Sequence, residues 1–175
     1  QYHERVPFVK ALSERAIRRA ADQGNIRTLL GRRCRFDKWE PMQFGTRKIM
    51  DHKTAYAEHG NAIKRAFTHK AMNRLIQGSA ADMTKKAMQL LFEEGIIPHI
   101  QVHDELDFSV ESEEQAVKIK EIMEHCVEIK VPVKVDVELG PNWGEAKDAS
   151  KVIAHAESVR GWTRGSESDY TKQAV

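Results

Sequence analysis

The chain has 175 residues, of which 41% are hydrophobic and 31% are charged. That length suits one ordinary domain with at most a short appended tail, and excludes a complete multi-domain enzyme. No apolar run approaches the roughly 20 residues that cross a bilayer, so we expect no membrane association. The first residue is Gln1, with no initiator Met or signal sequence, and we interpret this start as a cut edge.

Charge is divided unevenly along the chain, although the formal net charge is only +2. Residues 1–100 hold 19 Lys or Arg against 10 Asp or Glu, whereas residues 101–175 hold 9 against 16. This asymmetry indicates either a polyanion lying along the first part of the chain or a solvated cationic face. The crowded basic residues are Arg15, Arg18, Arg19, Arg27, Arg32, Arg33 and Arg35.

Apolar residues at helical spacing predict an amphipathic helix over residues 7–22, with Gly24 as its stop. Residues 25–36 are short and β-tolerant, and they predict a small hairpin or an irregular loop. Residues 37–60 show no clear period, so we expect a connecting segment with some helix. Residues 61–94 carry a long apolar stripe with three-four spacing, which predicts a helix ended by Gly95.

The last third predicts strands around one capped helix. Apolar residues alternate with polar ones on both sides of residues 103–105, which indicates a hairpin with an acidic turn. Ser112 and Gln115 form a capping-box pattern before the next helix, and residues 133–139 alternate as a final strand. Beyond Trp143, which we expect to be a packing anchor, the sequence becomes polar and aperiodic. The predicted class is α+β, a small antiparallel sheet with the acidic hairpin, backed by long helices.

Three ionisable residues at the turn, His103, Asp104 and Glu105, break the usual preference of tight turns for Asn, Asp and Gly. Adjacent carboxylates at a turn can diverge, so that one faces a metal ion while the other supports it. Mg²⁺ takes one or two protein carboxylates and fills its other positions with water and phosphate oxygens. The alternative is an ordinary solvent-exposed acidic turn.

The predicted helix over residues 61–94 carries His69, Asn73 and Gln77 at intervals of four, beside its apolar stripe. Asn and Gln amides can donate to the purine N3 and pyrimidine O2 acceptors of the DNA minor groove, which every Watson–Crick pair presents. Contact of this kind tolerates any sequence but depends on pair geometry. The alternative is an ordinary polar helix surface.

Two motifs in this order resemble the C-terminal palm region of family A DNA polymerases. They are Gln77-Gly78-Ser79-Ala80-Ala81-Asp82 on a helix and Val102-His103-Asp104-Glu105-Leu106 between strands. The resemblance extends upstream to Glu14-Arg15 and Gly31-Arg32-Arg33, and downstream to residues 133–137 and Gly140-x-x-Trp143. It covers residues 1–147 as the palm portion, which leaves residues 148–175 as a polar C-terminal tail.

The resemblance implies roles for individual residues. Asp104 would be a catalytic metal ligand, Glu105 its acidic neighbour and His103 a contact to the primer end. Asn73 and Gln77 would hold the minor groove of the primer-template. His69 stands where bacterial members usually carry Arg and phage-type members can carry His, which favours a phage-like source. The expected compartment is the cytoplasm of a bacterium or of a phage-infected host.

Other parts of the family pattern are missing from this sequence, namely a second metal-binding Asp and a fingers helix that binds the incoming nucleotide. Two-metal-ion nucleotidyl transfer needs carboxylates for both Mg²⁺ ions, which Asp104 and Glu105 cannot supply alone. We therefore expect the chain to be inactive without a further segment, present in cis or as a separate subunit. Deoxynucleoside triphosphates would bind through that segment.

Primer-template DNA is the expected partner, with phosphate contacts from basic residues near the proposed duplex helix. One alternative is a DNA-binding or assembly module that keeps the palm fold without chemistry. Another is an autonomous metal-dependent nuclease built from the acidic turn with His99 or His103. The expected phosphate contacts are Arg32, Arg33, Arg35 and Lys70.

Overall fold

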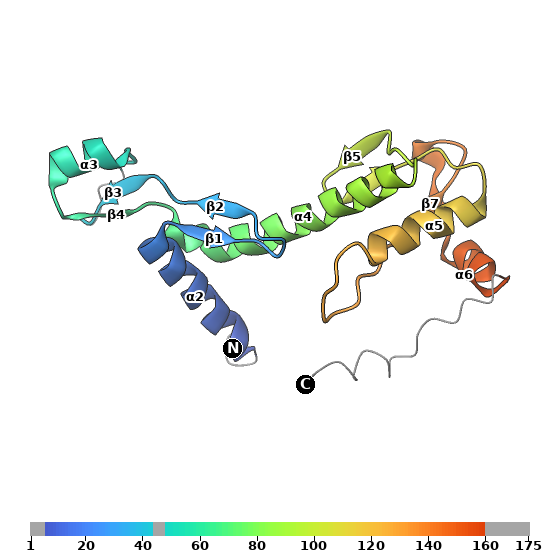
Figure 1. The fold of residues 1–175 in the computed structure, drawn as a ribbon, viewed down its shortest axis with the longest axis horizontal. Helices are drawn as coiled ribbons and strands as arrows, with labels where there is room; N and C mark the ends of the chain where they lie inside the picture. Colours follow the sequence, from blue (N-terminus) through green and yellow to red (C-terminus); the bar gives the residue numbers. More distant parts are fainter. Residues whose placement is uncertain (1–5, 44–47, 160–175) are drawn as a thin grey trace. The chain divides into compact units, whose positions relative to one another are not determined.

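The structure is a computed structural model that describes residues 6–43 and 48–159. The chain divides into two compact units, Gln1–Asp82 and Met83–Val175. Helices alternate with short antiparallel strands in both units (Figure 1), which confirms the predicted α+β class. The described strands form four separate two-stranded pairs instead of one small sheet.

Helix α2 (Pro7–Gln23) opens the first unit and matches the predicted helix. Pro7 fits the first turn because the backbone donor that proline lacks has no partner there. The helix ends at Gly24, which has a φ of 69° and donates its backbone N–H to Ala20 O at 3.1 Å. A side chain at Gly24 would also collide with the Arg65 guanidinium, 2.6 Å from the position of its Cβ.

Strands β1 (Asn25–Arg27) and β2 (Arg33–Arg35) form an antiparallel hairpin in which Ile26 faces Cys34. The hairpin is one of the two structures that the sequence predicts for this segment. Thr28 N donates to Arg32 O at 2.9 Å and closes the loop between the strands. The loop therefore returns β2 beside β1 with Thr28 and Arg32 at its base.

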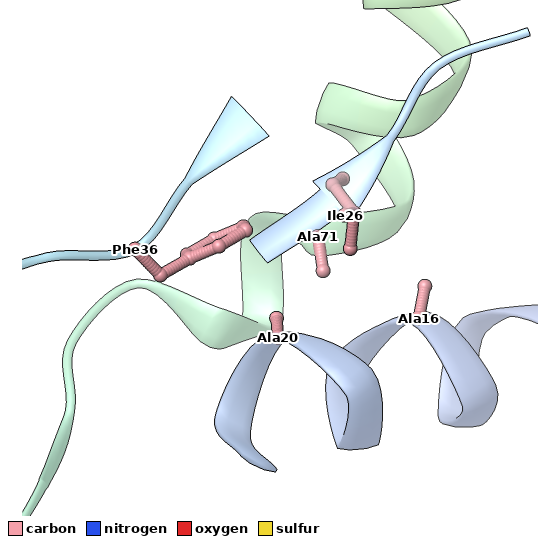
Figure 2. Close-up of a cluster of buried hydrophobic side chains, with 5 residues drawn as sticks. All are labelled: Ala16, Ala20, Ile26, Phe36 and Ala71. Carbon is pink, nitrogen blue, oxygen red and sulfur yellow. The ribbon is translucent and has the colours of Figure 1, made fainter. Parts of the chain in front are cut away.

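The core of the first unit is built from small residues on helices and two larger side chains on and after the hairpin (Figure 2). Ile26 and Phe36 are each only 2% exposed, and burial of such side chains contributes about 1.5–3 kcal/mol each. The alanines let backbones approach closely, so that α2 lies near β1 and the start of helix α4 (Ala71–Glu93). The buried cluster comprises Ala16, Ala20, Ile26, Phe36 and Ala71.

Strands β3 (Trp39–Pro41) and β4 (Ile63–Arg65) pair antiparallel and enclose helix α3 (His52–His59). Helix α3 confirms some helix in the connecting segment, but the predicted helical start at residue 61 is wrong. Residues 63–65 pair with β3, and Phe67 has a φ of 62°, which interrupts helical geometry. The 3-10 turn η1 (Thr68–Lys70) follows, and helix α4 (Ala71–Glu93) begins only after it.

The second unit begins within α4, whose end has the Schellman pattern. Ile96 N donates to Leu91 O at 2.9 Å, and Gly95, with a φ of 75°, donates to Phe92 O at 3.0 Å. Gly95 therefore ends the helix as predicted. Strands β5 (Ile100–Val102) and β6 (Glu105–Asp107) follow as an antiparallel hairpin.

Helix α5 (Glu113–Glu124) begins at Ser112, whose side chain accepts from Gln115 N at 3.3 Å, as the capping pattern predicts. After it come β7 (Glu138–Leu139), η2 (Trp143–Glu145), β8 (Lys147–Asp148) and α6 (Ser150–Val159). Helix α6 packs on α5 through Ile153, Ala116 and Val117. The core of the second unit therefore includes residues beyond Trp143.

Three expectations for this region differ from the structure. Only residues 138–139 of the predicted strand 133–139 pair with another strand, although partial burial still alternates along it. Trp143 is 69% exposed and does not anchor packing within the unit. Residues 150–159 form helix α6, because Ile153 is buried against α5, and residues 160–175 of the expected tail lie outside the described residues.

Candidate nucleic-acid interface and metal-binding turn

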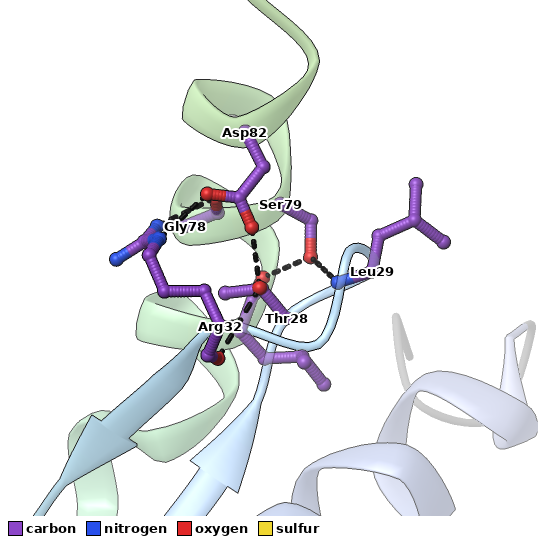
Figure 3. Close-up of polar contacts among 7 residues, drawn as sticks. Thr28, Leu29, Arg32, Gly78, Ser79 and Asp82 are labelled. Atoms are coloured by element: carbon purple, nitrogen blue, oxygen red, sulfur yellow. Dashed lines mark hydrogen bonds and ion pairs between the residues drawn. The ribbon is translucent and has the colours of Figure 1, made fainter. Parts of the chain in front are cut away.

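The tip of the β1–β2 hairpin docks on α4 through polar contacts (Figure 3). Thr28 Oγ1 donates to Asp82 Oδ2, and Arg32 Nε donates to Asp82 Oδ1 at 2.6 Å. Arg32 Nη2 also donates to the backbone oxygen of Gly78 at 2.9 Å. Thr28 and Arg32 of the hairpin therefore both form hydrogen bonds to the turn of α4 that contains Gly78 and Asp82.

A second set of contacts joins the same surfaces. Leu29 N donates to Ser79 Oγ at 3.0 Å, and Ser79 Oγ donates back to Leu75 O at 2.7 Å. The hydroxyl of Ser79 thus satisfies a backbone donor of the loop while staying bonded to its own helix. We call Thr28, Arg32, Ser79 and Asp82 the docking network.

Asp82 is the buried carboxylate of the docking network, and it is only 5% exposed. A buried carboxylate is costly unless hydrogen bonds and an opposite charge compensate it, and Thr28 and Arg32 supply both. The hydrogen bond to Asp82 is the main cause that raises the pKa of Arg32 above its ordinary value. Arg32, which we expected to bind DNA phosphate, therefore uses two of its nitrogen atoms within the protein.

Gly78 allows the hairpin to approach α4 this closely. A Cβ at position 78 would lie 2.9 Å from Thr28 Cγ2 and 3.2 Å from Arg32 Nη2. Glycine in a helix interior costs about 1 kcal/mol relative to alanine, so the close contact explains its presence. Gly78, Ser79 and Asp82 of the Gln77–Asp82 motif therefore have structural partners on the hairpin.

The amide residues of α4 lie on its exposed surface. Asn73 and Gln77 are both exposed and one helical turn apart, as the sequence predicts. His69 is exposed but lies in η1, so the prediction that it shares one regular helix with the amides is wrong. Lys70, also in η1, is exposed with its ammonium 5.2 Å from the centre of the Phe67 ring.

Strand β2 and helix α2 present further positive charge. Arg33 and Arg35 are exposed on β2, and Arg33 lies opposite Arg27 of β1. Like charges directly opposite on a strand pair are destabilising, which favours an anion nearby. A groove of about 540 Å³ along α2 and β1 adds further arginines to this surface. Those that line it are Arg15, Arg18, Arg19 and Arg27.

The acidic turn lies in the second unit, between β5 and β6. His103 and Asp104 form the two-residue connection, whereas Glu105 is the first residue of β6 and pairs with Val102. All three predicted site residues of the turn are exposed. His103 has a φ of 54°, and its backbone oxygen accepts from Gln101 Nε2 at 3.0 Å.

The donor set of the turn fits part of a magnesium site. Asp104 and Glu105 offer exposed hard oxygen ligands, the kind that Mg²⁺ prefers. Residues 6–43 and 48–159 contain no group of three or more His, Cys, Asp or Glu side chains placed to hold one metal ion. The turn therefore offers two carboxylates, which are part of the ligand set of such an ion.

The sequence did not reveal the partnership of Thr28 with Asp82, because 54 positions separate the two residues. A glycine inside a helix that carries a long apolar stripe, four residues before an aspartate, is the signal that could have indicated close docking on this face. No described helix is both long and apolar enough to cross a membrane.

Comparison with known proteins gives matches over most of the chain. It is 41% identical over 145 residues to a DNA-directed DNA polymerase of Pseudomonas phage M6. It is 36% identical over 156 residues to DNA polymerase I of Bacillus subtilis (strain 168). These matches cover 83% and 84% of this chain, which spans less than a fifth of those relatives, 19% and 16%.

A solved structure agrees with these matches. The POL domain of Pol1 from M. smegmatis, in complex with DNA primer-template and dNTP, superposes with a TM-score of 0.58 at 30% identity. The superposition covers 82% of this chain and 24% of that one. The sequence profile described as "DNA polymerase family A" matches residues 1–145. Because this match covers most of the sequence, the chain belongs to DNA polymerase family A.

Proposed function

We propose that residues 1–147 are the C-terminal palm portion of a DNA-directed DNA polymerase that acts in replication or repair. The observation that carries this proposal is Asp104, exposed at a two-residue hairpin turn beside Glu105 in a chain of family A. The Pol1 domain that this chain resembles was solved with primer-template DNA and dNTP. The phage and bacterial relatives support a site of action in the cytoplasm of a bacterium or infected host.

Primer-template DNA would lie along the exposed surface of α4. The side-chain amides of Asn73 and Gln77 would donate to minor-groove acceptors of paired bases. Arg33, Arg35 and Lys70 would contact phosphate oxygens, with His69 at the edge of the same surface. Their exposure supports these roles, because such contacts need side chains that reach outward.

Asp104 and Glu105 would hold Mg²⁺ at the acidic turn. In a two-metal site the chemistry supplied would be activation of the 3′-hydroxyl at one ion and stabilisation of the leaving pyrophosphate at the other. His103, next to Asp104 in the turn, would contact the primer end and keep it aligned with these carboxylates. The ligands of a two-metal site would be completed by an Asp outside this sequence.

Other functions would come from further polymerase segments, joined in cis or supplied as a separate subunit. They would provide the other palm carboxylate and the fingers residues that bind deoxynucleoside triphosphates. We refer to the chain together with such segments as the assembled polymerase. The chain alone would bind DNA without incorporating nucleotides.

Substitution of the turn carboxylate tests this function. In the assembled polymerase, Asp104→Asn should reduce single-turnover nucleotide incorporation by about a thousandfold or more, because one charged ligand is lost. Primer-template affinity measured without a divalent cation should stay within about threefold of the original value, since Asp104 is not among the proposed phosphate contacts.

Asp136→Asn is the matched control, because Asp136 is an exposed carboxylate of the same unit and lies outside the turn. It should leave incorporation unchanged. Full activity of Asp104→Asn would contradict the catalytic assignment. DNA binding without incorporation by the original assembled polymerase would instead favour a DNA-binding or assembly module that keeps the palm fold.

A further inference from the structure

We propose that Thr28 and Asp82 are positioning residues that set where the amides of α4 meet the primer-template, and so determine how strongly mismatched primer ends are rejected. This inference rests on the proposed function, since it concerns the same DNA-binding surface. It gives a role to two buried polar residues that make no contact with DNA in that proposal.

The burial of the pair shows that the docking network is built into the fold. Thr28 and Asp82 are each 5% exposed, and the hydroxyl of Thr28 donates to the carboxylate of Asp82. Arg32 Nε donates to the other oxygen of the same carboxylate, Oδ1, at 2.6 Å. Polar groups buried in this way hold one arrangement, because any shift leaves a costly unpaired donor or acceptor.

Helical geometry places the docking network and the amides on different sides of α4. Successive residues turn by about 100°, so Asp82 lies roughly 140° around the axis from Gln77 and roughly 180° from Asn73. One side of the helix is thus fixed to the hairpin while the opposite side keeps its amides exposed. A tilt or slide of α4 on the hairpin would displace the amides directly.

The hairpin that contacts α4 also carries Arg33 and Arg35, which are two of the proposed phosphate contacts. Arg32, next to Arg33 in the chain, donates to the backbone oxygen of Gly78, the residue after Gln77. The docking network therefore fixes the spacing between cations that locate the DNA backbone and amides that probe the base pairs. Hydrogen bonds weaken steeply when their distance or angle changes, so mismatch rejection depends on that spacing.

Thr28→Val and Thr28→Ser form a matched pair of variants for the test. Valine keeps the shape of threonine but removes the hydroxyl that donates to Asp82, whereas serine keeps the hydroxyl. The experiment measures kcat/KM of the assembled polymerase for matched and mismatched primer ends, normalised to active sites titrated on matched primer. Gln77→Ala serves as the reference for direct loss of an amide.

We expect Thr28→Val to lower the matched-to-mismatched ratio by about tenfold, since small misplacements can cost up to about a hundredfold in rate. Thr28→Ser should restore the ratio, and Gln77→Ala should lower it as Thr28→Val does. A purely structural role would lower the melting temperature and the active fraction but leave the normalised ratio unchanged.

An unchanged ratio for Thr28→Val, with Gln77→Ala still reduced, would overturn the positioning role. Failure of Thr28→Ser to restore the ratio would overturn it too. If Thr28→Val does not fold, Arg32→Lys, which loses the paired contacts to Asp82 and Gly78, must lower the normalised ratio for the inference to stand. Absence of incorporation by the original assembled polymerase on matched primer would be a failure of the proposed function instead.

Discussion

At the scale of single residues, His103 has an unusual backbone conformation. Its φ of 54° lies in the left-handed region, which costs a side chain about 1–2 kcal/mol relative to the right-handed region. Glycine or asparagine usually occupies such turn positions. Strain of this kind persists where the surrounding structure or function requires the side chain, which supports a role for the imidazole at the primer end.

Replacement of His103 should separate stability from activity. In His103→Gly the turn loses its strain, so the melting temperature of the chain should be unchanged or higher. Nucleotide incorporation by the assembled polymerase should fall by roughly tenfold to a hundredfold, as expected for one lost hydrogen bond to a charged group. His103→Asn, which also tolerates this φ, is the control for backbone freedom and should lose the same activity. Full activity of both variants would remove His103 from the site.

At the scale of elements, regular periodicity made α2, α5 and the β5–β6 hairpin predictable, because their local patterns agree with their tertiary packing. The start of α4 was not predictable, since residues 63–65 pair with β3, more than 20 positions earlier. Helix α6 depends likewise on burial of Ile153 against α5. Long-range contacts override local preference at these places.

The candidate site likewise combines features that local sequence patterns predict with features that depend on long-range contacts. The outward position of Asn73 and Gln77 follows from their place beside the apolar stripe, and the acidic turn follows from alternation on both sides of it. The docking of the β1–β2 hairpin on α4 could not be read from either segment alone. It requires the fold to bring Thr28 and Asp82 together.

The close contact between the β1–β2 hairpin and α4 predicts how a substitution at Gly78 affects stability. In Gly78→Ala the new methyl group would lie within 3.0 Å of Thr28 Cγ2, and the hydrogen bond to Asp82 prevents Thr28 from moving away. We expect a loss of about 1–3 kcal/mol in the free energy of unfolding from overpacking, although alanine favours helix. Denaturant unfolding monitored by circular dichroism measures the change.

Gly144→Ala provides a glycine control, because the nearest other atom to its added Cβ is a side-chain oxygen at an ordinary 3.5 Å. That variant should change the free energy of unfolding by less than about 0.5 kcal/mol. If Gly78→Ala were as stable as the original chain, the close docking of hairpin and helix would be wrong.

At the scale of the whole molecule, the basic excess lies in the segment that also carries the amide surface. Residues 1–100 hold 19 Lys or Arg against 10 Asp or Glu, and the acidic turn lies in the remainder, where acidic residues are in excess. A duplex that contacts the basic surface releases counterions, so its affinity falls as salt increases. In the proposed function, charge would supply sequence-independent affinity for DNA, the amides would sense base-pair geometry, and the carboxylates would hold the metal ion.

Neutralising the proposed phosphate contacts tests whether these charges supply the sequence-independent part of the DNA affinity. The triple variant Arg33→Gln, Arg35→Gln, Lys70→Gln should reduce the slope of log affinity against log salt by about 2–3, since each lost contact removes about 0.9. Fluorescence anisotropy with labelled primer-template at several salt concentrations measures the slope. A control triple variant with the same charge change should leave it unaltered, and equal slopes for both triples would refute the assignment. The control replaces the exposed residues Lys130, Lys134 and Lys147 with Gln.

The most direct measurement is a crystal or cryo-electron microscopy structure of the assembled polymerase with primer-template, an incoming nucleotide and Mg²⁺. We predict a carboxylate oxygen of Asp104 about 2.1 Å from a Mg²⁺ ion at the primer end. We also predict amide nitrogens of Asn73 and Gln77 within hydrogen-bonding distance of minor-groove acceptors. A structure in which the turn lies away from the reacting phosphate, or α4 away from the duplex, would contradict these assignments.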